Sequence, residues 1–117
     1  MNTEQLRKYC LAKKSVTEDF PFDDKVLAFR IAKKIFLLTS YKKPLSMNLK
    51  AEPELAIEFR KKFEGEVTPG YHMNKKHWNS VMLEGKIPVK DLKMMIDHSY
   101  EQVLKSLTKK ERDGVLS

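Results

Sequence analysis

The chain has few of the residues that build disulfides, membrane spans or secretion signals. Cys10 is its only cysteine among 117 residues, so an internal disulfide is impossible and a reducing, cytoplasmic setting is expected. The longest apolar runs, Val26–Phe29 and Ile35–Leu38, are far shorter than a membrane span. No apolar core follows the N-terminal charges, which argues against a signal peptide. We therefore expect one domain over residues 1–117, without membrane contact.

Motifs for catalysis, metal binding and nucleotide binding are also missing. The sequence contains no glycine-rich phosphate loop, Walker sequence or dinucleotide fingerprint. His72 and His77 are five residues apart, a spacing that does not favour zinc, and no cysteine pair could complete such a site. Cys10 and His98 fall on or beside the buried stripes of predicted helices, where packing roles are more common. We expect no metal, no cofactor and no catalytic residue, and hence a protein that is not an enzyme.

Acidic residues are absent from one long segment. Residues 25–50 carry seven Lys or Arg and no Asp or Glu, while the net charge of the whole chain is +7. Such a localised basic field attracts polyanions such as nucleic acid, or anionic small molecules. The alternative is a solubilising face on an exposed sheet. Acids just before this segment, Glu18, Asp19, Asp23 and Asp24, lack the pattern of a calcium loop and would balance nearby basic charge.

The periodicity of apolar residues predicts the element order α-β-β-β-α-β-α. Asn2–Lys14 is a helix, with Asn2 and Gln5 spaced as in a capping box. Three strands follow between Asp24 and Lys50, with tight turns at Lys33-Lys34 and at residues 41–44. Because consecutive strands are joined by short turns, the sheet should be antiparallel, with helices on one face and the other face open. The fold class is therefore α+β.

The second half of the chain supplies two helices and one strand. A helix begins at Pro53 and ends near Gly65, and Trp78–Leu83 is a further strand of the sheet. A long amphipathic helix follows Pro88. The residues after Thr108 are polar and are predicted to be a frayed tail.

The stretch Thr68–Val81 combines residue types that no single structural role requires. It offers cationic donors in Lys75, Lys76 and His77, flat rings in Tyr71, His72 and Trp78, and amides in Asn74 and Asn79. Cations beside stacking aromatics are typical of nucleic-acid binders, and amides match the donors and acceptors of base edges. The alternative is that Trp78 and Tyr71 anchor a loop to the core while the lysines are only solvated.

Several segments, in the same order along the chain, resemble the MmcQ/YjbR-like family. They are Tyr9-Cys10-Leu11, Thr17-Glu18-Asp19-Phe20-Pro21-Phe22, Leu49-Lys50, Glu52-Pro53-Glu54-Leu55-Ala56, Thr68-Pro69-Gly70-Tyr71-His72-Met73-Asn74-Lys75-Lys76-His77-Trp78-Asn79 and Asp97-His98-Ser99-Tyr100. The resemblance implies a CyaY-like α+β fold and DNA binding of a double-wing type, in which hairpins act as wings. Iron binding, known for frataxin-like proteins, is not carried over, because Glu4 stands among several basic residues on the first helix.

Together these patterns favour a basic, non-enzymatic protein that binds DNA or another polyanion, and a monomer is favoured. The residues expected to contact nucleic acid are Arg30, Lys33, Lys34, Lys42, Lys43, Lys50, Lys75, Lys76, His77 and Trp78. Arg30, Lys34 and Lys50 should share the exposed face of the sheet with the loop lysines. The alternative is a small-molecule or protein-binding domain whose pocket lies beside Tyr71–Trp78, lined by Tyr71, His72, Asn74 and Asn79.

Overall fold

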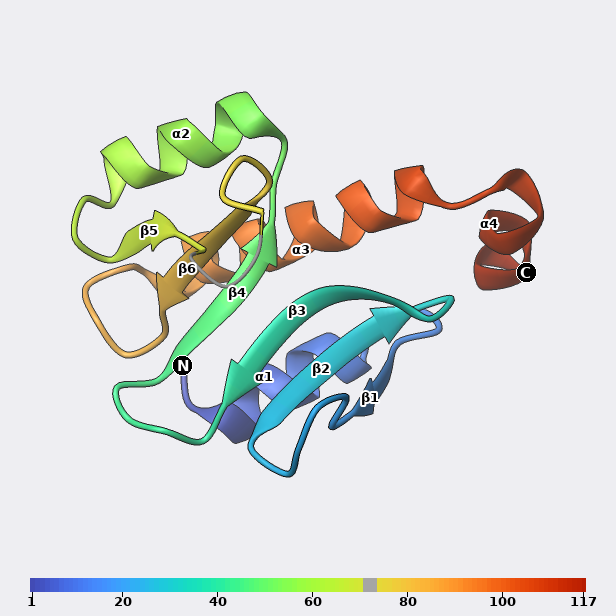
Figure 1. Ribbon diagram of the computed structural model, residues 1–117, viewed down its shortest axis with the longest axis horizontal. Helices are drawn as coiled ribbons and strands as arrows, with labels where there is room; N and C mark the ends of the chain where they lie inside the picture. Colours follow the sequence, from blue (N-terminus) through green and yellow to red (C-terminus); the bar gives the residue numbers. More distant parts are fainter. Residues whose placement is uncertain (71–73) are drawn as a thin grey trace.

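The computed structural model describes residues 1–70 and 74–117, and these form four helices and one six-stranded sheet (Figure 1). The helices are α1 (Thr3–Leu11), α2 (Pro53–Lys62), α3 (Val89–Ser106) and α4 (Lys109–Leu116). The strands are β1 (Thr17–Asp19), β2 (Val26–Ile31), β3 (Lys34–Ser40), β4 (Ser46–Lys50), β5 (Val67–Pro69) and β6 (Trp78–Met82). The predicted α+β fold is confirmed.

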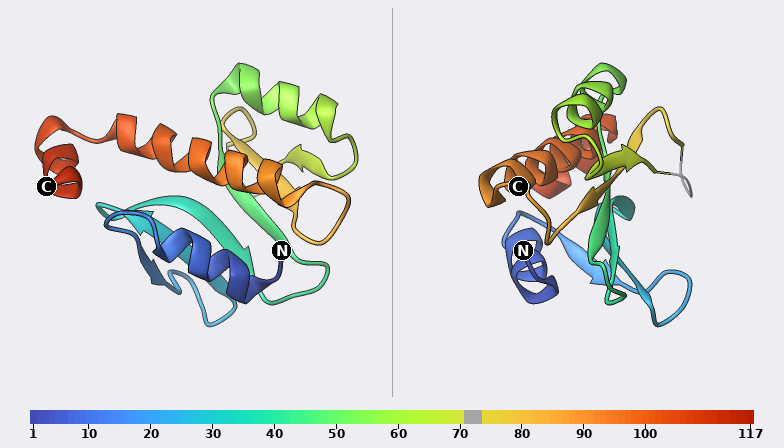
Figure 2. Two further views of the ribbon diagram at one scale, coloured as in Figure 1. Left: turned by 180° about the vertical axis from the view of Figure 1, so that it is seen from behind. Right: turned by 90° about the vertical axis from the view of Figure 1, so that its left-hand side faces the viewer.

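The sheet is antiparallel between every pair of neighbours, in the order β1-β2-β3-β4-β6-β5. Helices α1 and α3 cover one face of it, and α2 lies at the β5–β6 end (Figures 1 and 2). On the opposite side, residues 20–25 between β1 and β2 project away from the sheet, as do residues 74–77 before β6 (Figure 2). We call this uncovered side the open face. None of the helices in the described residues is both long and apolar enough to span a membrane.

Burial alternates along β4 as the sequence predicts. In β4, Met47 and Leu49 are in the core, whereas Ser46, Asn48 and Lys50 are partly exposed on the open face. A bulge in β3 explains its longer apolar run. Phe29 pairs with Leu37 and Arg30 with Ile35, so Phe36 is an extra residue without a partner in the ladder.

The bulge also changes how β3 meets the core. Phe36 and Leu37 are both fully buried there, although neighbours in a regular strand face opposite sides. The ring of Phe36 meets Tyr100 of α3 edge to face, with centroids 5.6 Å apart. The bulge thus lets two consecutive large side chains of one strand enter the core.

The C-terminal segment corrects one prediction. The residues after Thr108 were expected to fray, but they form α4, whose N-terminus is closed by a capping box between Thr108 and Glu111. Val115 of α4 is only 5% exposed and belongs to the core. The helix is not apparent from the sequence because the segment is mostly polar. Its cap, Thr108 with Glu111, and its one buried apolar residue, Val115, hold it in place.

Two short strands were also not anticipated. β1 and β5 have three residues each, too few for alternation to be visible in the sequence. They pair with β2 and β6 respectively and form the two edges of the sheet. The sequence predicts only a connection where β1 forms.

The turn between β2 and β3 holds two non-glycine residues at positive φ, Ala32 at 47° and Lys33 at 72°. This two-residue hairpin turn favours Asn or Gly, because L-residues with a Cβ are strained in that region. We expect Ala32→Asn to raise the free energy of unfolding by about 0.5 kcal/mol. Urea denaturation would measure it, with Ala12→Asn at the C-cap of α1 as a control in ordinary helical geometry. A loss of stability in Ala32→Asn would contradict the prediction.

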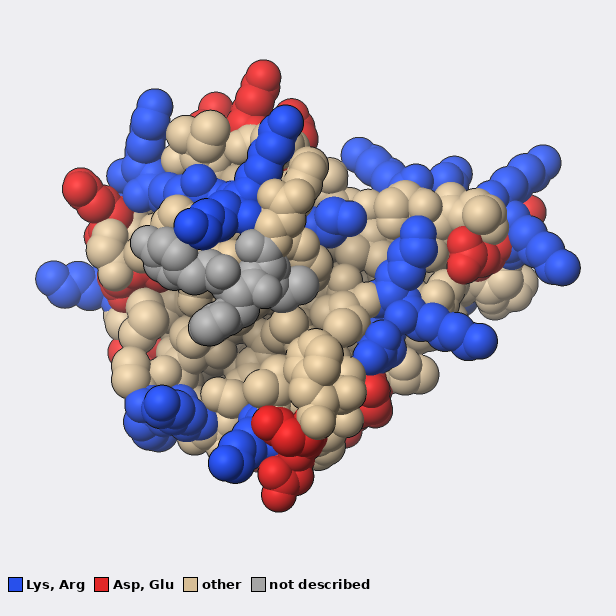
Figure 3. Space-filling model, in the orientation of Figure 1, with Lys and Arg blue, Asp and Glu red and all other residues tan. Residues whose placement is uncertain are grey.

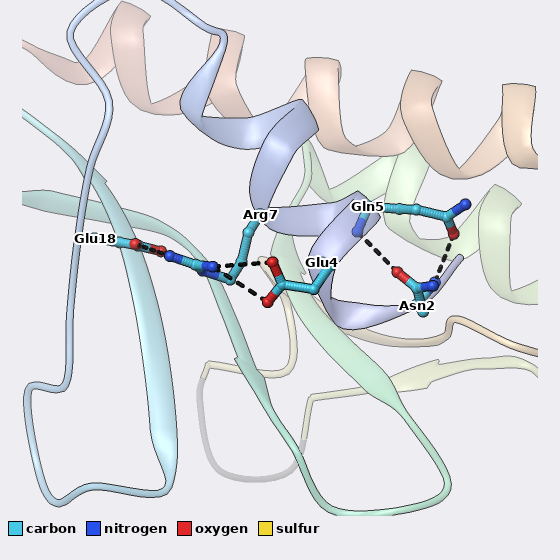
Figure 4. Close-up of polar contacts among 5 residues, drawn as sticks. All are labelled: Asn2, Glu4, Gln5, Arg7 and Glu18. Carbon is cyan, nitrogen blue, oxygen red and sulfur yellow. Dashed lines mark hydrogen bonds and ion pairs between the residues drawn. The ribbon is translucent and has the colours of Figure 1, made fainter.

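At the N-terminus, α1 has the capping box that the sequence predicts. The Gln5 backbone N–H donates to the Asn2 side chain, and the Asn2 N–H donates to the Gln5 side chain (Figure 4). The Arg7 guanidinium lies between Glu4 and Glu18 and ties α1 to β1 (Figure 4). These carboxylates, Glu18 foremost, raise the pKa of Arg7.

The acidic segment before β2 balances local charge, as expected. Glu18 pairs with Arg7, Asp19 pairs with Arg30, and Asp23 accepts from the backbone N–H groups of residues 25 and 26. Those two backbone hydrogen bonds lower the pKa of Asp23. Among the described residues no group of three His, Cys, Asp or Glu side chains is arranged to hold a metal ion.

Candidate nucleic-acid interface

The open face brings residues of the basic segment next to the stretch Thr68–Val81. Lys50, the last residue of β4, is the register partner of Trp78, the first residue of β6. Asn48 and Ser80 are the next partners on the same face, and Asn48 is also opposite Leu38 of β3. The two features that stood apart in the sequence therefore share one face of one sheet.

Trp78 is an anchor rather than an exposed stacking ring. Its side chain is 9% exposed, and it lies on the open face, outside the main core cluster. Gly70 packs directly against it: a Cβ at Gly70 would lie 3.2 Å from the Trp78 Cβ, and the Gly70 N–H donates to the Trp78 carbonyl at 2.9 Å. The Pro-Gly pair in the sequence thus permits close approach to Trp78. This corrects the expectation that Trp78 would contact nucleic acid directly.

The two asparagines of the stretch have structural roles. Asn79 is 2% exposed, and its amide accepts from Arg60 Nε at 2.6 Å and donates to the Ala56 carbonyl at 3.1 Å. The Asn74 side chain accepts from the Lys76 N–H at 3.0 Å, and its carbonyl accepts from residues 77 and 78. The prediction that Asn79 contacts a ligand is therefore wrong, because it is buried and its amide oxygen and nitrogen each already have a partner. Asn74 remains exposed but shapes its own turn.

Three of the predicted basic contacts are engaged within the protein. Arg30 pairs with Asp19 at 2.7 Å, and Lys43 pairs with Glu84 at 2.7 Å. Lys34 does not lie on the open face as predicted, because its ammonium donates to the Ser106 carbonyl at the end of α3. There it meets the negative end of the helix dipole. The charge pattern of the sequence does not show which basic residues are engaged in this way and which are not.

Four other lysines keep their side chains available. Within residues 1–70 and 74–117, no ion pair involves Lys33, Lys42, Lys50 or Lys76. Lys33, Lys42 and Lys76 are exposed and Lys50 is half-buried. Lys75 is also exposed, and its carbonyl accepts from Arg60, which holds this part of the chain against α2. His77 is half-buried, and its carbonyl accepts from the Ala51 N–H at 2.7 Å.

These lysines surround the open face rather than forming one patch. Lys33 and Lys50 lie toward one end of the β3–β4 pair, and Lys42 follows the other end of β3, roughly 20 Å away at about 3.3 Å per residue. Figure 3 shows basic groups over the α2 side, over the β2–β3 turn and at the β3–β4 loop, around a central area without charge. Acidic groups on this view gather mainly at the edges. Tyr71 and His72 lie outside the described residues, so the predicted pocket beside them remains a prediction.

The run Asp97-His98-Ser99-Tyr100 reads like a set of catalytic groups, but each of its side chains is engaged by another segment of the chain. Asp97 accepts from Tyr9 and Lys13, and Tyr100 donates to the Lys14 carbonyl. Asp97 and Tyr100, three residues apart, share the side of α3 that meets residues 9–14, whereas His98 and Ser99 contact other segments. The run is therefore a ring of packing contacts around α3.

His98 and Ser99 are each held by the backbone of another element. The His98 ring accepts from the Glu52 N–H at 3.2 Å, and burial lowers the pKa of His98, which favours this neutral acceptor. The Ser99 hydroxyl donates to the Phe36 carbonyl at 2.5 Å and accepts from the Lys50 N–H at 2.9 Å. The sequence-based expectation of a packing or capping role for His98 is confirmed.

Cys10 and Tyr9 lie at the α1–α3 contact. Cys10 is fully buried, and burial raises the pKa of its thiol to about 12. Burial, together with the hydrogen bond to Asp97, raises the pKa of Tyr9 to about 12. Both groups therefore stay protonated near neutral pH, and Cys10 is the small core residue that its position in the helix predicts.

Aromatic residues on the open face were missed by the sequence reasoning. Phe22 is 72% exposed and Tyr41 is 53% exposed. Phe22 borders a hollow of about 440 Å³ along β3 and β4, and Tyr41 borders a second hollow of about 500 Å³. One feature of the sequence could have indicated that Phe22 is exposed. Phenylalanines stand on both sides of Pro21 in a predicted loop, and not on the buried stripe of a helix or strand.

The model of the YjbR family matches residues 11–102, most of the chain. The chain belongs to the YjbR family. It is 29% identical over 113 residues to the uncharacterised protein YjbR of Escherichia coli K12, covering 96% of this chain and 95% of that one. It is 34% identical over 97 residues to the uncharacterised protein YbdF of E. coli O157:H7, covering 82% and 79%.

Two solved structures share this arrangement. A Deinococcus radiodurans protein with a DUF419 domain has a TM-score of 0.89 and 37% identity, covering 97% of this chain and 87% of its own. A Pseudomonas syringae protein has a TM-score of 0.76 and 28% identity, covering 87% and 98%. Both solved structures therefore share with this chain the helix-covered antiparallel sheet described above.

Proposed function

We propose that this YjbR-family protein is a non-enzymatic nucleic-acid-binding protein that acts in the cytoplasm as a monomer and contacts its ligand through the open face. The observation that carries the proposal is the position of Lys33, Lys42, Lys50 and Lys76. They border the one sheet face left uncovered by α1 and α3, and no ion pair with a described residue neutralises them. Cations in this state attract phosphates and release counterions when they bind them.

The chemistry of the buried polar groups supports a binding role over a catalytic one. A nucleophile must be accessible and held beside a base. Cys10 is buried with a raised pKa, and the Ser99 hydroxyl is fully buried between two strands. These residues stabilise the scaffold, and the accessible cations remain for recognition.

Salt dependence and charge reversal test the proposal. If about four phosphates are neutralised, the logarithm of the binding constant should fall against the logarithm of salt with a slope of about −3.6 for a duplex or about −2.8 for a single strand. Lys50→Glu and Lys76→Glu should each weaken binding about tenfold, since each removes one contact and adds repulsion. Fluorescence anisotropy with labelled DNA would measure both effects.

Lys90→Glu provides the matched control. It changes the net charge by the same amount, but it lies exposed at the start of α3, where an acidic residue is favourable. Distant exposed charges are screened beyond about 10 Å at 0.1 M salt, so less than a twofold change is expected. If all three variants lose the same affinity for DNA, only the net charge of the protein matters. The open face would then not be the binding surface.

A further inference from the structure

We propose that the open face binds a single strand, with unpaired bases stacking on Phe22 and Tyr41 and entering the hollow between them and β4. This rests on the proposed function and names its ligand class. Phe22 lies in the β1–β2 connection and Tyr41 in the β3–β4 loop, and both are more than half exposed. Exposed aromatic rings beside cations are the usual platform for single-stranded nucleic acid.

The two hollows adjoin each other, and together we call them the track. The hollow beside Phe22 and the hollow beside Tyr41 share Val26 and Ser40 as lining residues. The track extends along β3 and β4 as far as Asn48, whose register partner on β6 is Ser80. Lys50, the register partner of Trp78, lies two residues beyond Asn48 on the same face of β4. Exposed rings thus border one end of the track, and a cation lies beyond the other.

The floor of the track suits a flat apolar ring. Leu38 is 8% exposed and Ile35 is half-buried, and neither belongs to the core cluster beneath α1 and α3. Ser46 and Asn48 add groups that donate and accept hydrogen bonds along the wall. This combination fits a nucleobase, which has an apolar face and a polar edge.

Charged residues at the rim of the track favour one path for the phosphate backbone of the bound strand. Lys42 lies next to Tyr41, and Lys25 borders the same hollow, while Lys50 stands at the β6 end. Two acids, Asp23 and Asp24, also border the hollow beside Tyr41. The Asp23 carboxylate is engaged by the backbone of residues 25 and 26, which holds the loop that carries Phe22. Phosphates would follow the lysine side and avoid Asp24.

A single strand fits this face better than a duplex does. In a duplex the base faces are stacked on each other, and only their edges are accessible in the grooves. The rings of Phe22 and Tyr41 could then contact only the backbone. Bases of a single strand present their faces, and stacking on an aromatic side chain tolerates any sequence.

The experiment compares two probes and three proteins. The probes are a fluorescein-labelled oligothymidine of about ten nucleotides, within the usual range of single-strand site sizes, and a duplex of equal length. The proteins are the wild type, Phe22→Ala and Ile57→Ala, the last removing an apolar side chain that is 47% exposed on α2. Phe22 is so exposed that its replacement should leave the fold intact, and thermal unfolding would verify this.

The expected result is that the wild type prefers the single strand. Phe22→Ala should weaken single-strand binding about tenfold and duplex binding less than twofold, while Ile57→Ala changes neither. If the wild type binds both probes and Phe22→Ala alters neither, the stacking site is wrong and the general nucleic-acid proposal survives. Failure of the wild type to bind either probe would overturn both. A dimer that Phe22→Ala converts to a monomer would assign this face to self-association instead.

Discussion

Replacing Ser99 with alanine is expected to lower the free energy of unfolding by about 3 kcal/mol. Ser99 is fully buried in α3, and its hydroxyl contacts two strands: it donates to the Phe36 carbonyl at the β3 bulge and accepts from the Lys50 N–H of β4. Alanine would leave a buried N–H without its partner and remove one hydrogen bond from a buried carbonyl. Each unsatisfied buried group costs about 1–3 kcal/mol.

Urea denaturation would measure the loss, which should correspond to a fall in melting temperature of roughly 10 °C. The matched control is Ser106→Ala, near the exposed end of the same helix, where the hydroxyl donates only to the Val103 carbonyl. It should change stability by about 0.5 kcal/mol or less. If both variants lose the same small amount of stability, the hydrogen bonds that Ser99 makes to β3 and β4 are not a source of stability. Because Ser99 holds the backbone of Lys50, its variant should also weaken binding at the open face.

Asn79→Ala has a comparable expected effect, a loss of about 3 kcal/mol. The buried amide joins β6 to α2 through the Ala56 carbonyl and Arg60, and Arg60 in turn donates to the Lys75 carbonyl. Removing it leaves the Ala56 carbonyl without this donor and frees Arg60 from its position. The chain before β6 would then lose its connection to α2, although no residue of the open face has been replaced.

Two further variants separate hydrogen bonding from packing. Asn79→Leu keeps the number and branching of the side-chain heavy atoms but removes both polar groups, and it should be at least as destabilising as alanine if hydrogen bonding dominates. Asn48→Ala, on the open face of the neighbouring strand, is the matched control and should lose about 0.5 kcal/mol or less. A stability of Asn79→Leu equal to that of the wild type would show that volume, and not the amide, is what the site requires.

Periodicity predicted most of the fold, because most elements are long enough to show it. The α1 capping box, the alternation in β2 and β4, and the stripe of α3 are each visible within one short window of sequence. β1 and β5 were not predicted, since three residues carry no period. α4 was missed because its stability depends on one apolar residue, Val115, which meets the core only after the rest of the chain has folded.

The candidate site was predicted less well, because a contact surface depends on pairings between distant residues. Lys43 and Lys42 are neighbours in the same basic turn, yet only Lys43 meets an acid, Glu84, 41 positions further along the chain. Trp78 and Asn79 look like contact residues by type, but both side chains are buried. Exposure of Phe22 and Tyr41, which defines the track on the open face, cannot be read from residue type at all.

The family, the α+β class and the concentration of positive charge in residues 25–50 follow from the sequence, because motifs, periodicity and composition are local properties of the chain. Which of these charges stay available depends on contacts between distant residues: Asp19, Glu84 and the end of α3 engage Arg30, Lys43 and Lys34. The tertiary structure also shows that Trp78 and Asn79, which look like contact residues in the sequence, are buried, while Lys76 close to them in the chain stays exposed.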